Sequence, residues 1–214
     1  MSMIAEPKKK ITLEEYFELE KKSGFKSEYH GGEILAMSGA NINHVRITRN
    51  AANALTQKLK GKRCEAFALD LKVFIESADR SVYPDVLVIC GKPQFHQNRK
   101  DTVLNPTIII EVLSASTKNY DKGEKFDHYR TLPSLQEYLL VDQSKVYLEH
   151  FQKTGEAKWT LEEHTAGKNV VRLAAIDAEL TLAELYEDVD WDMDNAVQTP
   201  NPSSAQPSDE PPQA

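Results

Sequence analysis

The sequence lacks several features that would indicate particular classes of protein. It has no run of about 18 apolar residues, so we expect no membrane-spanning helix. The first residues, MSMIAEPKKKITLEEY, hold positive charges with no apolar stretch behind them, which does not suit a secretory signal. The only two cysteines, Cys64 and Cys90, stand far apart and outside any CxxC spacing. We therefore expect two buried, reduced thiols in a cytoplasmic protein that has no membrane partner.

An excess of basic residues is also missing, since the net charge is −7. Six of the 33 acidic residues, and none of the 26 basic ones, lie from Asp188 onward, so the remainder holds 27 acidic against 26 basic residues. A nearly neutral body argues neither for nor against binding of nucleic acid. The best candidate for a phosphate-binding stripe is formed by Arg46, Arg49, Lys58, Lys60, Lys62 and Arg63.

The composition divides the chain into three parts, with no internal repeat. Residues 1–10 resemble a flexible N-terminal arm, and residues 11–187 have the periodicity of one folded domain. Residues 188–214 are acidic and rich in Pro and Ser. Because they hold few large apolar residues, they cannot bury enough surface to offset the entropy of ordering, and we expect a disordered tail.

Capping signals and apolar periodicity predict the helices. Thr12 and Glu15 have the spacing of a capping box at the start of a short helix. A longer amphipathic helix begins after Asn41 and ends at Gly61. Two further helices are expected at 116–132 and 181–187.

Apolar runs between turn residues predict the strands. Two short strands turn at Gly31-Gly32, and one strand each is expected over 64–76 and 82–90. The segment 107–142 reads as a βαβ unit, whose two strands are parallel and connected with right-handed chirality. Later strands are expected at 145–152, 158–164 and 169–176. The fold class is therefore α/β, with a mixed sheet flanked by helices and additional antiparallel strands.

The strand TIIIEVLS at 107–114 carries one carboxylate, Glu111, among apolar residues that place it in the centre of the sheet. An uncompensated buried carboxylate costs several kcal/mol. Glu111 must therefore be protonated, paired with a cation or bound to a metal. Two explanations need no metal: a nearby Lys or Arg pairs with it, or it reaches water at the strand end.

A second carboxylate repeats this pattern. Asp85 lies in the apolar segment VYPDVLVIC after Pro84, which cannot donate a ladder hydrogen bond, so Asp85 starts a strand or lies on a distorted segment. Pro-Asp is also a common turn pair, and a turn residue is the alternative. On adjacent strands, about 4.8 Å apart, Asp85 and Glu111 can share one ion. An all-oxygen site suits Mg²⁺ or Mn²⁺.

The helix after Glu111 offers a cation. Phe126 and Tyr129 are its expected anchors on the sheet, and Lys125 flanks both. The helix runs back alongside the strand for about 12 Å before Lys125, so that its side chain can reach Glu111. The alternative is a solvated face, because three lysines lie on one side of the helix: Lys118, Lys122 and Lys125.

Pro84-Asp85, followed by Glu111-Val112-Leu113, resembles the PD-(D/E)xK motif of nucleases. The longer pattern EVLSAST…D..EKFDHYR…EYLLVD resembles a large bacterial family of restriction endonuclease-like proteins, once a domain of unknown function. SEYHGGEI and Asn43-His44 add to this resemblance, which spans roughly residues 10–187. It implies the restriction-endonuclease-like fold, a mixed sheet flanked by helices.

The resemblance implies a DNA endonuclease that hydrolyses phosphodiester bonds with Mg²⁺ or Mn²⁺. Asp85, Glu111 and the backbone carbonyl of Val112 are the implied metal ligands. Leu113 occupies the position where the general motif has its lysine. In the family that this chain resembles, the lysine function moves to the following helix, where Lys125 matches. Lys125 is then expected to orient or help deprotonate the attacking water and to offset charge.

Glu28 and His44 match positions that recur in that family, and the resemblance implies supporting groups or additional ligands. Without it, Glu28 reads as a carboxylate that closes a turn and His44 as a residue of the helix surface or N-terminus. Asp70 is another acidic residue in an apolar setting, with no assigned role. The resemblance also implies a homodimer, in which two sites address two strands.

Two other functions are compatible with these residues. The chain can be a non-catalytic member of the fold that binds nucleic acid or a protein partner. It can also be a metal-carboxylate hydrolase of a small phosphoester, which would require a closed pocket and not a groove.

Overall fold

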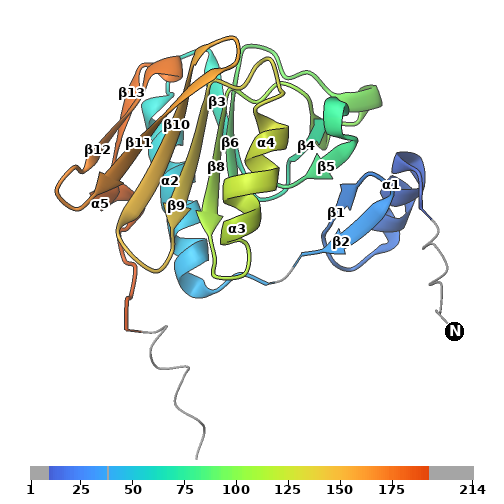
Figure 1. Cartoon of the computed structure of the whole chain (residues 1–214), viewed down its shortest axis with the longest axis horizontal. Helices are drawn as coiled ribbons and strands as arrows, with labels where there is room; N and C mark the ends of the chain where they lie inside the picture. The colour runs from blue at the N-terminus through green and yellow to red at the C-terminus, as the bar shows by residue number, and fades with distance from the viewer. Residues whose placement is uncertain (1–9, 38, 193–214) are drawn as a thin grey trace, which may run out of the picture.

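Residues 10–37 and 39–192 are described by a computed structural model of the chain (Figure 1). They form two mixed β-sheets, a two-stranded hairpin and five α-helices. None of these helices is long and apolar enough to cross a bilayer. The predictions for residues 1–9 and 193–214 lie outside the described residues, and the proposed domain boundaries stay predictions.

The larger sheet has six strands in the order β11-β10-β9-β8-β6-β3. Its central strands β8 and β9 are parallel, and the other neighbouring pairs are antiparallel. The predicted βαβ unit and the central position of TIIIEVLS are therefore confirmed. The strands are β3 (Cys64–Ala68), β6 (Val86–Cys90), β8 (Ile108–Leu113), β9 (Glu137–Asp142), β10 (Tyr147–Gly155) and β11 (Lys158–Thr165).

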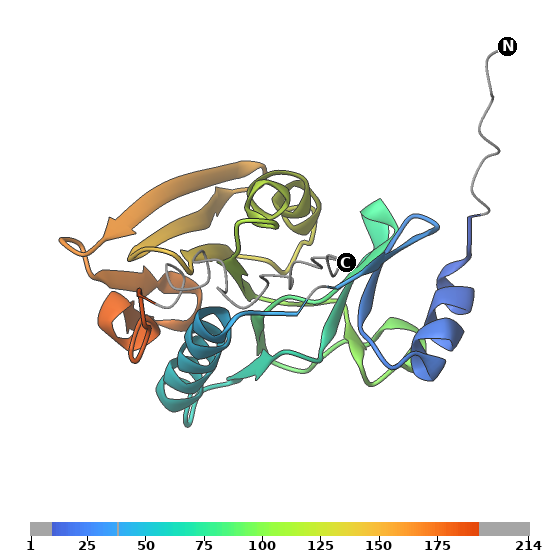
Figure 2. The same ribbon diagram turned by 90° about the horizontal axis from the view of Figure 1, so that it is seen from below.

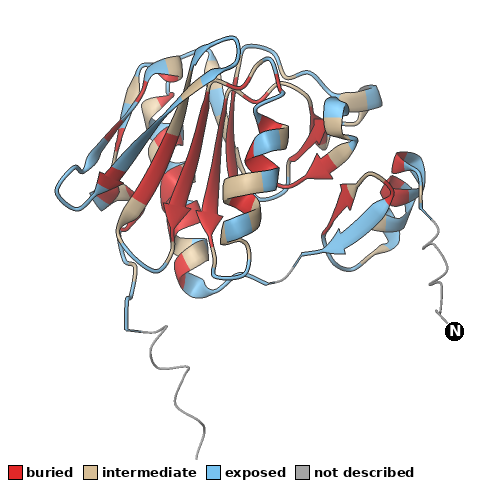
Figure 3. Cartoon of the chain, viewed as in Figure 1, coloured by how far each residue is buried: buried red, intermediate tan, exposed pale blue. Residues whose placement is uncertain are grey.

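The strands β8 and β9 are buried along their whole length, as Figure 3 shows in red. Isoleucines in β8 suit a strand that is covered on both faces. Ile108 and Ile110 pack into one core cluster, whereas Ile109 and Leu113 pack into another on the opposite face. Since side chains alternate along a strand, Glu111 lies on the face of Ile109 and Leu113.

Helices cover both faces of the larger sheet, and Figure 2 shows α2 on one side and the segment of α3 and α4 on the other. The cap of α2 is the predicted Asn41, whose side chain accepts a hydrogen bond from the backbone of His44. A small hairpin and α5 share the side of α2 and contribute to the same core cluster. The elements are α2 (Ile42–Lys58), α3 (Lys118–Tyr120), η3 (Asp121–Lys125), α4 (Phe126–Tyr129), β12 (Val170–Leu173), β13 (Ala178–Thr181) and α5 (Leu182–Leu185).

The smaller sheet has the order β2-β1-β5-β4-β7 and packs with α1. Thr12 and Glu15 form the predicted capping box of α1. The predicted turn at Gly31-Gly32 is present, with a positive φ at both residues, which suits glycine. The elements are α1 (Leu13–Lys22), β1 (Ser27–His30), β2 (Glu33–Ala36), β4 (Lys72–Ile75), β5 (Arg80–Val82) and β7 (Thr102–Val103), with 3₁₀ turns at Glu76–Ala78, His96–Asn98 and Ala174–Ile176.

The prediction of one continuous strand over each of 64–76 and 82–90 was wrong. The first segment divides into β3 and β4, and the second runs from the last residue of β5 into β6; in each case the two strands belong to different sheets. The first breaks at Leu69, which has a φ of 74°, and the second breaks around Pro84. The two crossings lie together, because the backbone N–H of Leu69 donates to the carbonyl of Asp85 at 3.2 Å. Asp85 therefore lies where the chain passes from the smaller sheet to the larger one.

The expectation of two buried, reduced thiols was also wrong. Cys64 and Cys90 are partly exposed and form a disulfide. They face each other in the ladder of β3 and β6, with their Cα atoms 3.9 Å apart. A spacing of 26 residues in the sequence carries no information about this pairing, because the pairing depends on strand register.

The double substitution Cys64→Ser and Cys90→Ser is expected to lower the free energy of unfolding by about 2–4 kcal/mol, the usual effect of removing a crosslink. Urea unfolding of both proteins without reductant measures it. In the presence of reductant, the difference between the two proteins should disappear. A wild-type protein that shows two free thiols after denaturation without reductant would contradict the pairing.

Candidate active site

Asp85, Glu111 and Lys125 gather where β6 begins and β8 ends, beneath the helical segment of α3, η3 and α4. Asp85 precedes β6, and Glu111 lies in β8. The register pairs Val86 with Ile110, so that Asp85 and Glu111 are the next residues opposite each other. By alternation along β8, the side chain of Glu111 lies on the face that this helical segment covers. Asp85, which lies just before β6, also contacts His44 of α2.

Lys125 reaches this place from the helical segment. Its Nζ lies 2.8 Å from Oε1 of Glu111, 3.5 Å from Oδ1 of Asp121 and 3.8 Å from Oε1 of Glu28. The residue is only 6% exposed, so a solvated lysine face does not describe it. Lys118 and Lys122 are more exposed and pair with Asp142 and Glu149 instead.

Local backbone geometry places Asp121 and Lys125 on the same side. Asp121–Lys125 form a turn of π-helix between two short α-helical pieces. Such turns are rare and frequently occur at functional sites. Asp121 is buried at 4% exposure, and sequence reasoning missed it. Its position four residues before Lys125 was the available signal.

Glu111 is 3% exposed, and its Oε1 accepts a hydrogen bond from the Tyr129 hydroxyl at 3.0 Å in addition to the contact with Lys125. Burial raises the pKa of Glu111 well above its usual value, and the charges of Asp85 and Asp121 act in the same direction. The charge of Lys125 opposes this rise without cancelling it. Glu111 is therefore short of positive charge in its surroundings.

Burial and the nearby carboxylates also have opposing effects on the pKa of Lys125. Burial by itself lowers the pKa of a lysine, but the carboxylates of Glu111, Glu28 and Asp121 outweigh this effect and raise it well above its usual value. Lys125 therefore keeps its proton, and its side chain is a fixed positive charge.

The carboxylate of Asp85 is held from two sides. Its Oδ2 accepts a hydrogen bond from the backbone N–H of Val112 at 2.7 Å, and its Oδ1 lies 3.0 Å from Nε2 of His44. Burial lowers the pKa of His44, but the contact with Asp85 outweighs this effect and raises it. His44, in the first turn of α2, thus donates to Asp85.

Glu28 contacts the segment between β5 and β6, where the chain passes from the smaller sheet to the larger one. Its Oε1 accepts from the backbone N–H of Tyr83 at 3.1 Å, and its Oε2 lies 3.1 Å from Nε2 of His30. Burial raises the pKa of Glu28, but Lys125 and His30 outweigh burial and lower it. Glu28 is therefore ionised and fixes the backbone just before Asp85. Asp70, by contrast, is exposed at a turn and pairs with Lys26, away from this group.

The donor chemistry of the site fits a hard divalent cation. Four carboxylates, those of Glu28, Asp85, Glu111 and Asp121, surround the single ammonium group of Lys125 or lie beside it. The charges of Asp85 and Asp121 raise the pKa of Glu111, so a second positive charge would stabilise the group. Oxygen ligands of this kind suit Mg²⁺ or Mn²⁺.

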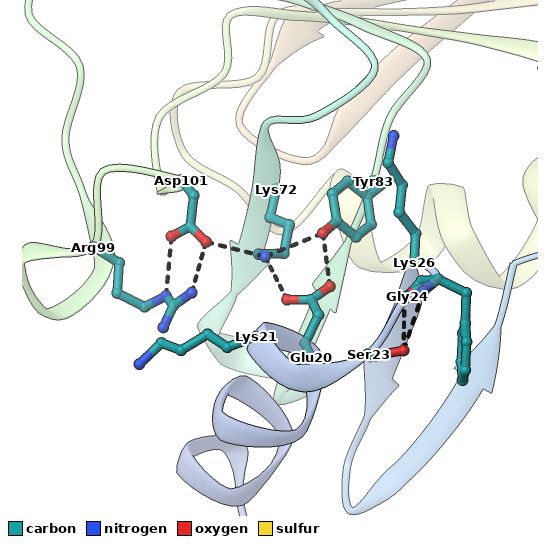
Figure 4. Close-up of a pocket in the computed structure, with 10 residues that line it drawn as sticks. Glu20, Lys21, Ser23, Gly24, Lys26, Lys72, Tyr83, Arg99 and Asp101 are labelled. Atoms are coloured by element: carbon teal, nitrogen blue, oxygen red, sulfur yellow. Dashed lines mark hydrogen bonds and ion pairs between the residues drawn. The ribbon is translucent and has the colours of Figure 1, made fainter.

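An open pocket of about 360 Å³ lies between α1 and the smaller sheet, and Tyr83 is one of its lining residues. Figure 4 shows Lys72 between its partners there: its Nζ lies 2.5 Å from Glu20, 3.1 Å from Asp101 and 3.1 Å from the Tyr83 hydroxyl. Because these charges are mutually satisfied, the cluster serves to hold α1 on the sheet. Asp85, Glu111 and Lys125 do not line this pocket.

The fold is that of a mixed α/β protein with a nuclease-like core. A solved structure from Anabaena variabilis, described as a "putative nuclease", superposes with a TM-score of 0.66 over 82% of this chain and 97% of that chain. The sequences are 19% identical, so this likeness concerns the fold alone.

A family model described as "Putative restriction endonuclease" matches residues 13–184, and the chain belongs to this family. Two uncharacterized proteins of Synechocystis sp. are similar to it. One is 41% identical over 161 residues, which make up 75% of this chain and 91% of the relative. The other is 35% identical over 182 residues, or 84% of this chain and 93% of the relative. The resemblance seen in the sequence is confirmed.

Lys125→Met is expected to lower the free energy of unfolding by about 3–5 kcal/mol at neutral pH, because it leaves buried carboxylates without their cation. Burial raises the pKa of Glu111 and Asp121, and the charge of Lys125 opposes this rise, so its removal raises both pKa values further. A carboxyl group whose pKa is raised by folding destabilises the protein increasingly as pH rises above its unfolded value, about 4. The loss in the variant should therefore be small near pH 4 and grow toward pH 7.

Urea unfolding at several pH values measures this dependence, with Lys118→Met as the matched control. Lys118 lies on the same helical segment, and its side chain is 39% exposed in its pair with Asp142. Its loss is expected to cost about 1 kcal/mol or less. A loss for Lys125→Met that is the same at pH 4 and pH 7 would indicate lost packing instead of lost charge compensation.

Proposed function

We propose that this protein is a Mg²⁺- or Mn²⁺-dependent endonuclease that hydrolyses phosphodiester bonds in DNA. The observation that carries this proposal is that Asp85, just before β6, lies close to the buried pair of Glu111 in β8 and Lys125 in η3. Membership of the family and the nuclease-like fold support it. Asp85, Glu111 and the carbonyl of Val112 are the proposed metal ligands.

A bound Mg²⁺ would lower the pKa of a coordinated water and offset the negative charge that develops on the phosphate. The protein's own residues prepare this chemistry. His44 and the backbone N–H of Val112 fix the carboxylate of Asp85, and the Tyr129 hydroxyl fixes that of Glu111. Held orientations of this kind reduce the reorganisation that the reaction requires.

The role of Lys125 follows from its charge. Its pKa lies well above the usual value, so it does not accept a proton from water at neutral pH. We infer that Lys125 orients the attacking water and offsets charge in the transition state, as a permanent cation. This function does not require lysine in the strand itself, where Leu113 is buried in the core under the helix.

A nicking assay on supercoiled plasmid DNA with Mg²⁺ or Mn²⁺ tests the proposal. Asp85→Asn, Glu111→Gln and Lys125→Met should each reduce the rate by about 10²-fold or more, because each removes a group that acts on the developing charge. Asp70→Asn, an exposed carboxylate outside the site, should retain the wild-type rate. The purified wild type should lose activity in chelator and regain it when metal is restored.

A non-catalytic, nucleic-acid- or protein-binding role is the second candidate. One observation weakens the case for a nucleic-acid ligand and therefore favours the protein-binding form of this role. The basic stripe is partly engaged by the C-terminal part of the chain: Lys58 pairs with Glu184 at 2.6 Å, Arg49 pairs with Asp188 at 3.6 Å, and Lys62 donates to the carbonyl of Ile176 at 2.8 Å. If the protein binds DNA but no metal restores nicking, and Asp85→Asn binds as well as the wild type, this role replaces the endonuclease.

We also propose a homodimer and a cytoplasmic location. The disulfide removes one argument for the cytoplasmic location, since thiols are usually reduced in the cytoplasm. The homodimer has support from β2, an edge strand of the smaller sheet. Its four residues are all exposed, including Ile34 and Leu35. Unpaired strand edges with apolar side chains favour association.

Light scattering after size exclusion should give the mass of two chains for the wild type, and of one chain for Leu35→Lys, because a charge at a buried contact opposes association. Leu161→Lys is the matched control, since Leu161 is an exposed leucine on β11, the edge of the other sheet. A monomeric wild type, or a dimer that only Leu161→Lys disrupts, would contradict this interface.

A further inference from the structure

A second group of ligand-type side chains lies on the opposite face of the larger sheet from Glu111. His150 in β10 pairs with Leu139 of β9, which in turn pairs with Ile110 of β8. Glu111 pairs with Leu140 and therefore points to the other face. His150 is thus on the side of α2, β12 and β13, and the sheet separates it from the candidate active site.

His150, Glu162 and His164 come together across the ladder of β10 and β11. His150 faces Glu162 directly, and His164 faces Leu148, two residues along. One ligand atom from each of the three side chains lies within 4.8 Å of the other two. Among the described residues, this is the only such group of three.

His164 is a buried polar side chain without a satisfactory partner. It is 1% exposed, and neither ring nitrogen has a hydrogen bond of normal geometry. Unsatisfied buried polar atoms are rare in native proteins, and each one calls for an explanation such as an ion.

His150 is oriented in the manner of a metal ligand. Its Nε2 lies 2.7 Å from Oε2 of Glu137, and Oε1 of Glu137 accepts from the backbone N–H of Ala175 at 2.7 Å. Glu137 is 1% exposed, so this contact is rigid and dry. Carboxylates that bind one nitrogen of a histidine commonly leave the other nitrogen directed at a metal. Here Nδ1 is the nitrogen that remains for an ion.

Glu162 completes the group from the solvent side. Its side chain is 52% exposed, and its Oε1 pairs with Lys168. The other oxygen, Oε2, lies 4.0 Å from Nε2 of His164. An ion can therefore enter from the side of Glu162, while the two histidines form the inner wall.

We propose that His150, His164 and Glu162 bind a transition-metal ion, with Zn²⁺ as the preferred ion and water as the fourth ligand. Two imidazoles and one carboxylate suit Zn²⁺, whereas Mg²⁺ prefers oxygen ligands alone. The ion connects the edge strand β11 to β10 and, through Glu137 and Ala175, to the turn between β12 and β13. Its role is structural, and it does not depend on the proposed endonuclease activity.

Metal-free full-length protein without an affinity tag tests this site. Co²⁺, as a spectroscopic probe for Zn²⁺, should give visible absorption bands of tetrahedral intensity at one equivalent, and Zn²⁺ should abolish them by competition. Zn²⁺ should also raise the melting temperature, because binding to the folded state alone stabilises it. His164→Leu should show neither the Co²⁺ bands nor the rise in melting temperature with Zn²⁺. Glu162→Gln should weaken Co²⁺ binding by about tenfold or more.

Two controls separate this site from other histidines. His128→Gln, a change in a partly exposed histidine of α4, should leave the Co²⁺ spectrum unchanged. The double variant Asp85→Asn and Glu111→Gln should retain the spectrum, although it should lack endonuclease activity. A loss of the bands in this double variant would place the Co²⁺ at the candidate active site and overturn the proposal.

The metal-free state gives a further check that does not depend on the spectrum. His164→Leu should be at least as stable as wild type without metal, because it removes two unsatisfied nitrogens from a buried position. With Zn²⁺ present, the order should reverse. A variant that is less stable by the same margin in both conditions, together with a wild type that Zn²⁺ does not stabilise, would show that His164 serves packing only.

Discussion

The ammonium group of Lys125 is the charge on which the arrangement of this protein depends. It contacts Glu111 of β8, Glu28 of β1 and Asp121 of its own helical segment, and all of these groups are buried. One cation thereby joins the two sheets and the helix that covers them. Buried carboxylates are tolerated only when they are compensated, so the position of this single side chain decides whether the surrounding packing is stable.

Irregular backbone is concentrated around this charge. The chain passes between the sheets at Leu69 and at Pro84-Asp85, and a π-helical turn presents Asp121 and Lys125. The two crossings and the π-helical turn depart from regular structure. Each of them either positions a side chain of the candidate site or supports a segment that positions one. Local rules of sequence are expected to fail where a site must be built, because ligand geometry and regular secondary structure make different demands.

Residues that lie on the two faces of one sheet have different chemistry. The face of Glu111 gathers carboxylates and a lysine, whereas the face of His150 carries imidazoles supported by Glu137. The alternation of a strand makes this possible, since neighbouring residues such as Ile110 and Glu111 point into separate surroundings. The core between the two faces is apolar and keeps the two groups apart.

The sequence alone determined the βαβ unit, the central strand, the caps at Thr12 and Asn41, and the route from Lys125 to Glu111. These features depend on residues near one another in the chain, so periodicity and spacing reveal them. Only the tertiary structure decided that Cys64 pairs with Cys90, that two expected strands divide between sheets, and that Asp121, His150 and His164 occupy charged or ligand-like surroundings. Those outcomes depend on which distant strands become neighbours and in what register, which no local pattern specifies.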